Sequence, residues 1–205
     1  MKLLDKLINN IKFDKKYVLF SIIIIMLGII TGAFFIVILN TADKNTIIEY
    51  ITSYIENINN IDNINILKNT LITNYICIFI LIIIGYSCFL FPVNILILFY
   101  KAFIIGFTIS SFILTFKLKG IFLSIIYIVP HLIVNILIFA LITSFTLRLS
   151  ISMIKYIIKK KDVNIRLYFN KYFSLITLSI LIITLTSLYE SYIVPHLFKI
   201  IIKIL

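Results

Sequence analysis

The feature that most constrains this chain is an apolar run from Tyr17 to Leu39 that contains no charged side chain. A helix of about 20 apolar residues crosses the hydrocarbon core of a bilayer. The run is longer than the apolar region of a cleavable secretion signal, about 7–15 residues, and no small-x-small cleavage pattern follows it. We therefore expect the run to be a permanent membrane span.

The composition extends this expectation to the rest of the chain. Hydrophobic residues make up 62% of the 205 residues and charged residues 13%, whereas soluble domains have about 45–50% and 25%. An ordinary cytosolic enzyme, a disordered chain and a secreted disulfide scaffold are thereby excluded. The formal net charge of +11 suggests nucleic acid only in a soluble protein. We interpret it as a membrane-topology signal and expect no nucleic-acid partner.

Apolar sequence resumes after a polar segment, with Pro92 as the natural turn between two further spans. The expected spans are 17–39, 70–91, 93–115, 121–147 and 172–194. This pattern predicts an all-α integral membrane protein, a single membrane domain (1–205) built as a bundle of about five transmembrane helices.

Charges between the spans predict the orientation. Residues 1–16 contain five lysines and two aspartates, and the loop 148–171 contains seven basic residues against one aspartate. Both segments are expected in the cytoplasm. The loop 40–69 has four acidic residues and two lysines, and we expect it outside. The N-terminus is then cytoplasmic and the C-terminus extracytoplasmic, in a bacterial cell membrane.

Apolar residues recur at helical spacing within the loop 40–69. This pattern predicts a short extracytoplasmic amphipathic helix that lies on the membrane or on a partner. Its apolar side is a candidate partner-binding face, made of Ile47, Ile51, Tyr54, Ile55 and Ile58.

Small residues and prolines mark the expected helix contacts and bends. Gly28 and Gly32 form a GxxxG pattern, which lets two helices approach closely within one chain or between copies in a homo-oligomer. Pro92, Pro130 and Pro195 are expected at a turn or a kink, because proline removes a backbone donor.

Four polar side chains inside the apolar runs are candidates for a functional or packing role. They are Lys101, His131, Asn135 and Glu190. Lys101 either reaches a membrane interface or points into the bundle, opposite Glu190. His131 and Asn135 share a helix face, which favours either polar packing against a neighbouring helix or an ion or proton site.

Catalytic and cofactor signals are not evident. The sequence has no Walker A, GxSxG or HExxH pattern and no glycine-rich nucleotide loop. His196 is the only histidine besides His131, so we expect no metal site. The expected outside segment is too short for a hydrolase domain. We predict a protein that is not an enzyme and has no cofactor.

A series of short motifs follows in order along the chain. These are Gly28–Gly32, Asn69 and Asn74, Gly85, Pro92, Tyr100–Phe107 with Gly106, Leu118–Ile121, Pro130–His131, and Glu190 with Pro195. In this order they resemble the stage II sporulation protein M family over most of the chain. Ala102 stands where the family usually has glycine. The resemblance implies helix packing at Gly106.

The resemblance also implies a function in endospore formation. Members of the family lie in the mother-cell membrane at the septum during engulfment. There they act as a scaffold for two peptidoglycan-degrading partners, stage II sporulation proteins D and P. A channel or transporter subunit is the alternative hypothesis, since ionisable groups within spans often mark a transport path. It predicts that the four intramembrane polar residues converge on one cavity.

Overall fold

A computed structural model of the chain describes residues 14–57, 62–86, 90–159 and 165–198. All regular structure in these ranges is helical, and five helices are long and apolar enough to cross a membrane. The predicted all-α membrane architecture with five spans is therefore confirmed.

The helices follow one another with short connections. They are α2 (Lys15–Ile38), α3 (Thr41–Glu56), α4 (Asn63–Tyr86), α5 (Phe91–Phe116), α6 (Leu118–Lys159), α7 (Ile165–Leu188) and the π-helical segment η2 (Tyr189–Ile193). The chain is helical again over 194–198, so the candidate span containing α7 and η2 extends from Asn170 to Phe198.

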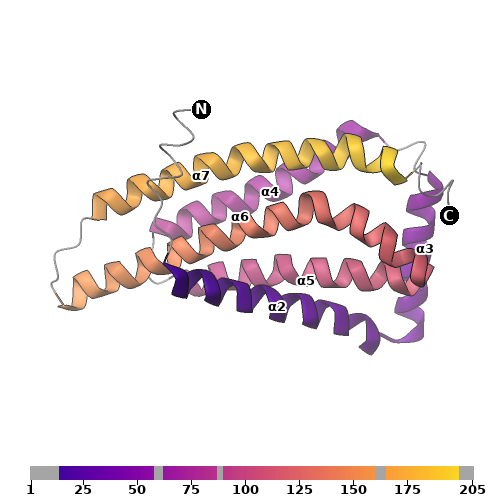
Figure 1. Ribbon diagram of the computed structural model, residues 1–205, viewed down its shortest axis with the longest axis horizontal. Helices are drawn as coiled ribbons and strands as arrows, with labels where there is room; N and C mark the ends of the chain where they lie inside the picture. The colour runs from indigo at the N-terminus through magenta and orange to yellow at the C-terminus, as the bar shows by residue number, and fades with distance from the viewer. Residues whose placement is uncertain (1–13, 58–61, 87–89, 160–164, 199–205) are drawn as a thin grey trace.

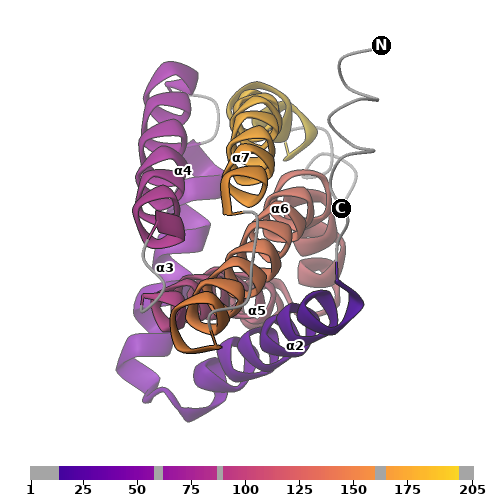
Figure 2. The same ribbon diagram turned by 90° about the vertical axis from the view of Figure 1, so that its left-hand side faces the viewer.

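The long helices lie side by side, and α3 runs across one end of the bundle (Figure 1). Seen along the bundle, α6 lies centrally, with α2 and α5 on one side and α4 and α7 on the other (Figure 2). We call the end where α3 lies the α3 end of the bundle.

Several helix boundaries differ from those expected. Helix α4 begins at Asn63 instead of Thr70, so the polar loop is shorter than 40–69. Helix α6 continues to Lys159, well into the expected basic loop 148–171. The first part of this continuation has a packing reason, because Leu149 is buried and Met153 packs against the core, whereas residues 155–158 are exposed. Burial of the apolar side of a helix outweighs scattered lysines, whose long side chains reach outward to water.

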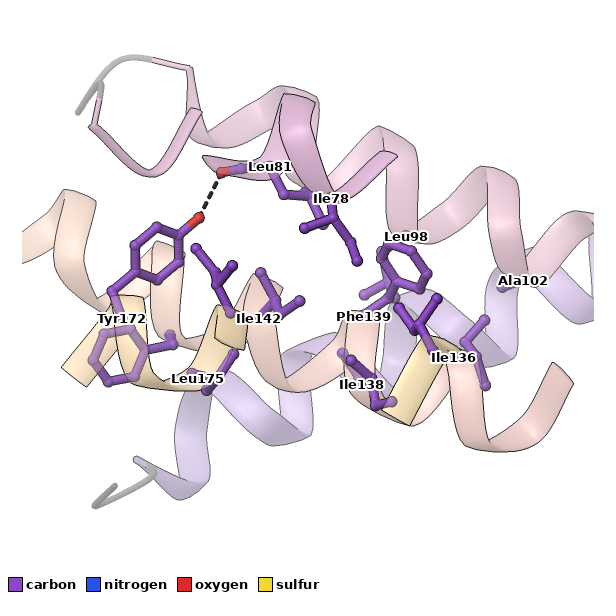
Figure 3. Packing of buried hydrophobic residues seen from close by; sticks show 14 of the residues in the cluster. Ile78, Leu81, Leu98, Ala102, Ile136, Ile138, Phe139, Ile142, Tyr172 and Leu175 are labelled. Carbon is purple, nitrogen blue, oxygen red and sulfur yellow. Dashed lines mark hydrogen bonds between the residues drawn. The ribbon is translucent and has the colours of Figure 1, made fainter. Parts of the chain in front are cut away.

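The main core joins α4, α5, α6 and α7 (Figure 3). Leu81, Leu98 and Ile142 are fully enclosed at its centre. Tyr172 on α7 stacks on Phe145 with ring centroids 6.1 Å apart, and its hydroxyl donates to the Leu81 carbonyl. In a membrane such packing and interhelical hydrogen bonding hold helices together, because lipid is as apolar as the core.

Helix α2 packs most extensively against α5. A Cβ atom on Gly28 would lie 2.6 Å from the Cβ of Ala102, and one on Gly32 would overlap the Phe103 carbonyl. From the other side, a Cβ on Gly106 would overlap the Ile29 carbonyl. The two backbones can therefore touch only because these positions lack side chains. The GxxxG contact lies within one chain.

Helices α5 and α6 are joined by a tight turn at Lys117, which has φ of 52°. A Cβ on Gly120 would overlap the Phe112 carbonyl, so glycine is required for the turn to fold back on α5. Pro92 occupies the first turn of α5, where its missing N–H costs nothing. Pro130 lies inside the continuous helix α6, which bends in its first half (Figure 1).

Helix α3 begins with Asn40 as its N-cap, whose side chain accepts from the Asp43 amide at 2.8 Å. Its apolar side faces the bundle. Ile51 and Ile55 pack on a second core cluster at the α3 end, made of Phe112, Leu123, Val194 and Phe198. The predicted amphipathic helix is therefore present, but these two isoleucines contact the protein's own bundle.

Candidate functional site

Lys101 lies on α5 and points into the bundle. Its ammonium donates a hydrogen bond to the Asn74 side-chain oxygen on α4, at 3.0 Å. The same ammonium lies 5.3 Å from the ring centre of Phe139 on α6. An amide oxygen and an aromatic face both stabilise a cation where water is scarce. Lys101 thus joins three helices.

Glu190 lies in the π-helical segment of the last span. Its side chain is 17% exposed, and one carboxylate oxygen lies 3.8 Å from Nε2 of His131, which is fully buried on α6. Thr70 of α4 and Lys101 of α5 line the same cavity as the Glu190 carboxyl group, and Lys101 attracts it electrostatically. Three helices therefore supply polar groups around Glu190.

The π-helical segment has a local cause in Pro195. Proline offers no N–H to the carbonyl four residues earlier, and its ring clashes with that carbonyl, here of Ser191. Widening the helix by one residue relieves the clash, and such π-segments are frequent at functional sites. Glu190 is within the widened turn Tyr189–Ile193.

Asn135, one turn after His131 on α6, is buried as well. Its side-chain oxygen accepts a hydrogen bond of 2.6 Å from the Thr186 hydroxyl on α7. Asn135 therefore links α6 to α7 next to the charged groups.

These side chains meet at a cavity of about 250 Å³, which we call the polar cavity. Its apolar walls come from Ile105, Leu132, Ile136 and Phe139. Its polar lining consists of Asn69, Thr70, Thr73, Asn74, Lys101, Asn135 and Glu190. Three of the four predicted intramembrane polar residues line it, and the fourth, His131, contacts Glu190. The structure thus brings all four together.

A second cavity of about 570 Å³ lies beneath α3, and we call it the apolar cavity. It is lined mainly by apolar and hydroxyl side chains of α3, α4 and α5, among them Ile47, Ile51 and Phe107. Tyr54 also lines it, and burial, followed by the nearby Glu190 carboxylate, raises the pKa of the Tyr54 phenol above its ordinary value. The candidate partner-binding residues Ile47, Ile51 and Tyr54 therefore face this cavity.

Other predicted residues do not join the site. Ile58 lies outside the described residues, and His196 is exposed. Within the described ranges, no group of three His, Cys, Asp or Glu side chains could hold a metal ion. The sequence did not predict that polar side chains of α4 would belong to the site. Thr70 was expected as the first residue of a span, whereas it lies inside α4 and lines the polar cavity together with Glu190.

The fold and the site together define a multi-pass membrane protein with a charged polar cluster inside its helix bundle. Residues 21–195 match the family described as stage II sporulation protein M. The chain belongs to this family and is a sporulation-related membrane protein. Comparison with curated proteins and with solved structures gives no significant match.

Proposed function

We propose that this protein is a non-enzymatic membrane scaffold that holds peptidoglycan-degrading partners at the septal membrane during engulfment. The observation that carries the proposal is the family match over residues 21–195. The partners implied by the family are stage II sporulation proteins D and P. In this proposal the N-terminus is cytoplasmic, and α3 lies on the side of the membrane that faces the cell wall.

The exposed side of α3 is the surface that we propose for partner contact. The predicted apolar face is largely turned toward the bundle and the apolar cavity. The opposite side is exposed and presents Glu49 and Ser53. Next to this side, at the edge of the apolar cavity, Tyr50 is 73% exposed and adds an aromatic side chain of the type that often anchors protein interfaces.

Localisation of a fluorescent hydrolase partner in sporulating cells tests the scaffold. Deletion of this protein is expected to disperse the partner from the septum and block engulfment. The Glu49→Ala/Tyr50→Ala variant is expected to do the same while itself remaining at the septum. Lys68→Met, an exposed substitution on α4, is the matched control. A partner that stays at the septum in the deletion strain contradicts the proposal.

A channel or transporter subunit is the second candidate function. It is supported by the convergence of Lys101, Asn135 and Glu190 on one cavity, with His131 against Glu190. Vesicles containing the purified protein should then pass an ion or small solute, and Glu190→Gln should reduce that flux. Wild-type vesicles that are as tight as protein-free vesicles contradict this function. That result would not contradict the proposed scaffold function.

A further inference from the structure

The polar cavity is lined by one basic and one acidic side chain, Lys101 and Glu190, on helices that are candidate membrane spans, where ionisable groups are rare without a partner. Lys101 uses one of the three hydrogens of its ammonium on Asn74. Glu190 lies against His131 and beside Thr70, and acceptor positions on its two oxygens are available to a ligand. Both side chains line the cavity. The cavity therefore offers hydrogen-bond donors on a positive group and acceptors on a negative group.

The apolar cavity adjoins the polar cavity. Asn69, Thr70 and Glu190 line both. Away from these three residues, the larger cavity is bordered by side chains such as Ile66, Phe107 and Phe112. Its volume, about 570 Å³, lies within the range of about 300–1,000 Å³ typical of ligand pockets. A polar compartment joined to an apolar one matches a molecule with a polar head and an apolar chain.

The charges select the type of head group. An anionic head would be attracted by Lys101 but repelled by Glu190, and a purely cationic head would meet the opposite problem. A zwitterionic head satisfies both residues. A primary ammonium also donates hydrogen bonds to a carboxylate, which a quaternary ammonium cannot do.

We propose that the two cavities form a binding site for a zwitterionic phospholipid with a phosphoethanolamine head. The ammonium lies at Glu190, the phosphate at Lys101, and part of an acyl chain in the apolar cavity beneath α3. Apart from the α3 residues, the lining side chains belong to candidate membrane spans. A bilayer lipid is therefore the amphiphile present at the highest concentration around the site. This site is independent of the proposed scaffold function.

Native mass spectrometry of the full-length purified protein tests the proposal. The protein is taken from mixed vesicles that contain phosphatidylethanolamine, phosphatidylcholine and phosphatidylglycerol with identical acyl chains. Wild type is expected to retain phosphatidylethanolamine in preference to the other two. Glu190→Gln is expected to lower the preference for phosphatidylethanolamine over phosphatidylglycerol about tenfold, the effect of losing one charged hydrogen bond. Lys101→Met is expected to lower retention of phosphatidylethanolamine and phosphatidylcholine by a similar factor.

Exposed substitutions of the same chemistry serve as controls. Glu49→Gln on α3 and Lys68→Met on α4 should leave lipid retention unchanged, because both residues are exposed and line neither cavity. Glu190→Asp, which keeps the carboxylate, should keep the lipid preference. Each variant is compared with wild type by size-exclusion profile and thermal stability, so that unfolding is recognised.

Two results would overturn the proposal. The first is that the wild-type protein shows no preference for phosphatidylethanolamine. The cavities would then be filled by water or by a segment of a partner. This measurement needs no variant, so it cannot fail because a variant unfolds. The second is displacement of bound lipid by equimolar glycerophosphoethanolamine, which has the same head group and no acyl chains. That result would assign the polar cavity to a free zwitterion.

Discussion

Asn135 on α6 is buried, and its side-chain oxygen accepts the hydrogen bond from Thr186 on α7. A buried amide that loses its partner carries the full cost of desolvation, whereas removal of both partners is close to neutral. In membrane proteins such pairs contribute about 0.6 kcal/mol on average and up to about 1.7 kcal/mol. The polar residues around the cavity therefore stabilise the bundle as well as shape the site.

The Asn135–Thr186 pair can be tested by a double-mutant cycle. Thr186→Val is expected to lower the free energy of unfolding by about 1 kcal/mol, because it leaves the Asn135 oxygen buried without this donor. Adding Asn135→Leu should recover part of that loss. Unfolding in mixed detergent micelles measures Thr186→Val, Asn135→Leu and the double variant, with the exposed substitution Val37→Ile as a control. Strictly additive effects would contradict the coupling.

Gly32 is the glycine of α2 whose contact with α5 leaves the least room for a side chain. In Gly32→Val the new side chain would overlap the Phe103 carbonyl, so the helices must separate along their contact. We expect a loss of about 1–3 kcal/mol or more in stability, measured as a lower thermal midpoint in detergent. The reference is Val37→Ile, at a site 65% exposed on the same helix. Equal thermal midpoints for Gly32→Val and Val37→Ile would contradict a close α2–α5 contact at Gly32.

At the scale of elements, the widened helical turn of η2 sets the direction of Glu190. The cause is a single proline four residues after Ser191, and the consequence is a carboxylate aligned with His131. Helix α3 provides a second example. Its helical periodicity is clear in the sequence, but the surface that its apolar side covers is formed by α5, α6 and the last span.

Replacement of Pro195 tests the origin of the π-helical segment. Pro195→Ala restores an N–H toward Ser191, so the segment should return to α-helical geometry and Glu190 should turn away from His131. In a chain without native cysteines, the His131→Cys/Glu190→Cys pair should be joined by a short bifunctional thiol reagent, because the contact is made by the ends of two long side chains and a direct disulfide would be too short. Pro195→Ala should reduce the yield of this cross-link several-fold. Unchanged cross-linking would show that packing, and not the proline, holds the turn.

At the scale of the whole molecule, five helices are long and apolar enough to cross a membrane, and the proposed topology, with the N-terminus in the cytoplasm and α3 outside, rests on the charges between them. The basic continuation of α6 and the acidic helix α3 lie at opposite ends of the bundle (Figure 1). This separation of charge is what the positive-inside rule requires of a protein whose loops are sorted during insertion.

The orientation can be measured with a membrane-impermeant maleimide on intact cells. Glu49→Cys on α3 should be labelled directly, because α3 is expected on the outside. Lys155→Cys on α6 should be labelled only after permeabilisation, because the basic segment is expected in the cytoplasm. Both positions are exposed, so accessibility differs only by the side of the membrane. The opposite labelling pattern would invert the proposed topology.

The sequence by itself determined the fold class and the number of spans, because a chain this apolar has few ways to satisfy its backbone in lipid. It also identified Lys101, His131, Asn135 and Glu190, since each is costly within an apolar run. Helix boundaries such as Asn63 and Lys159 could not be predicted from the sequence, because they depend on packing against other helices.

Only the tertiary structure decided which of these features belong together. Periodicity defines the faces of a helix but not the neighbour that each face meets. The structure shows that the glycines of α2 pack against the backbone of α5. It also shows that the apolar side of α3 packs against the end of the bundle. For the same reason the sequence did not predict that Thr70 would line the polar cavity. The polar cavity exists because side chains distant in sequence, on α4, α5, α6 and η2, converge through helix packing.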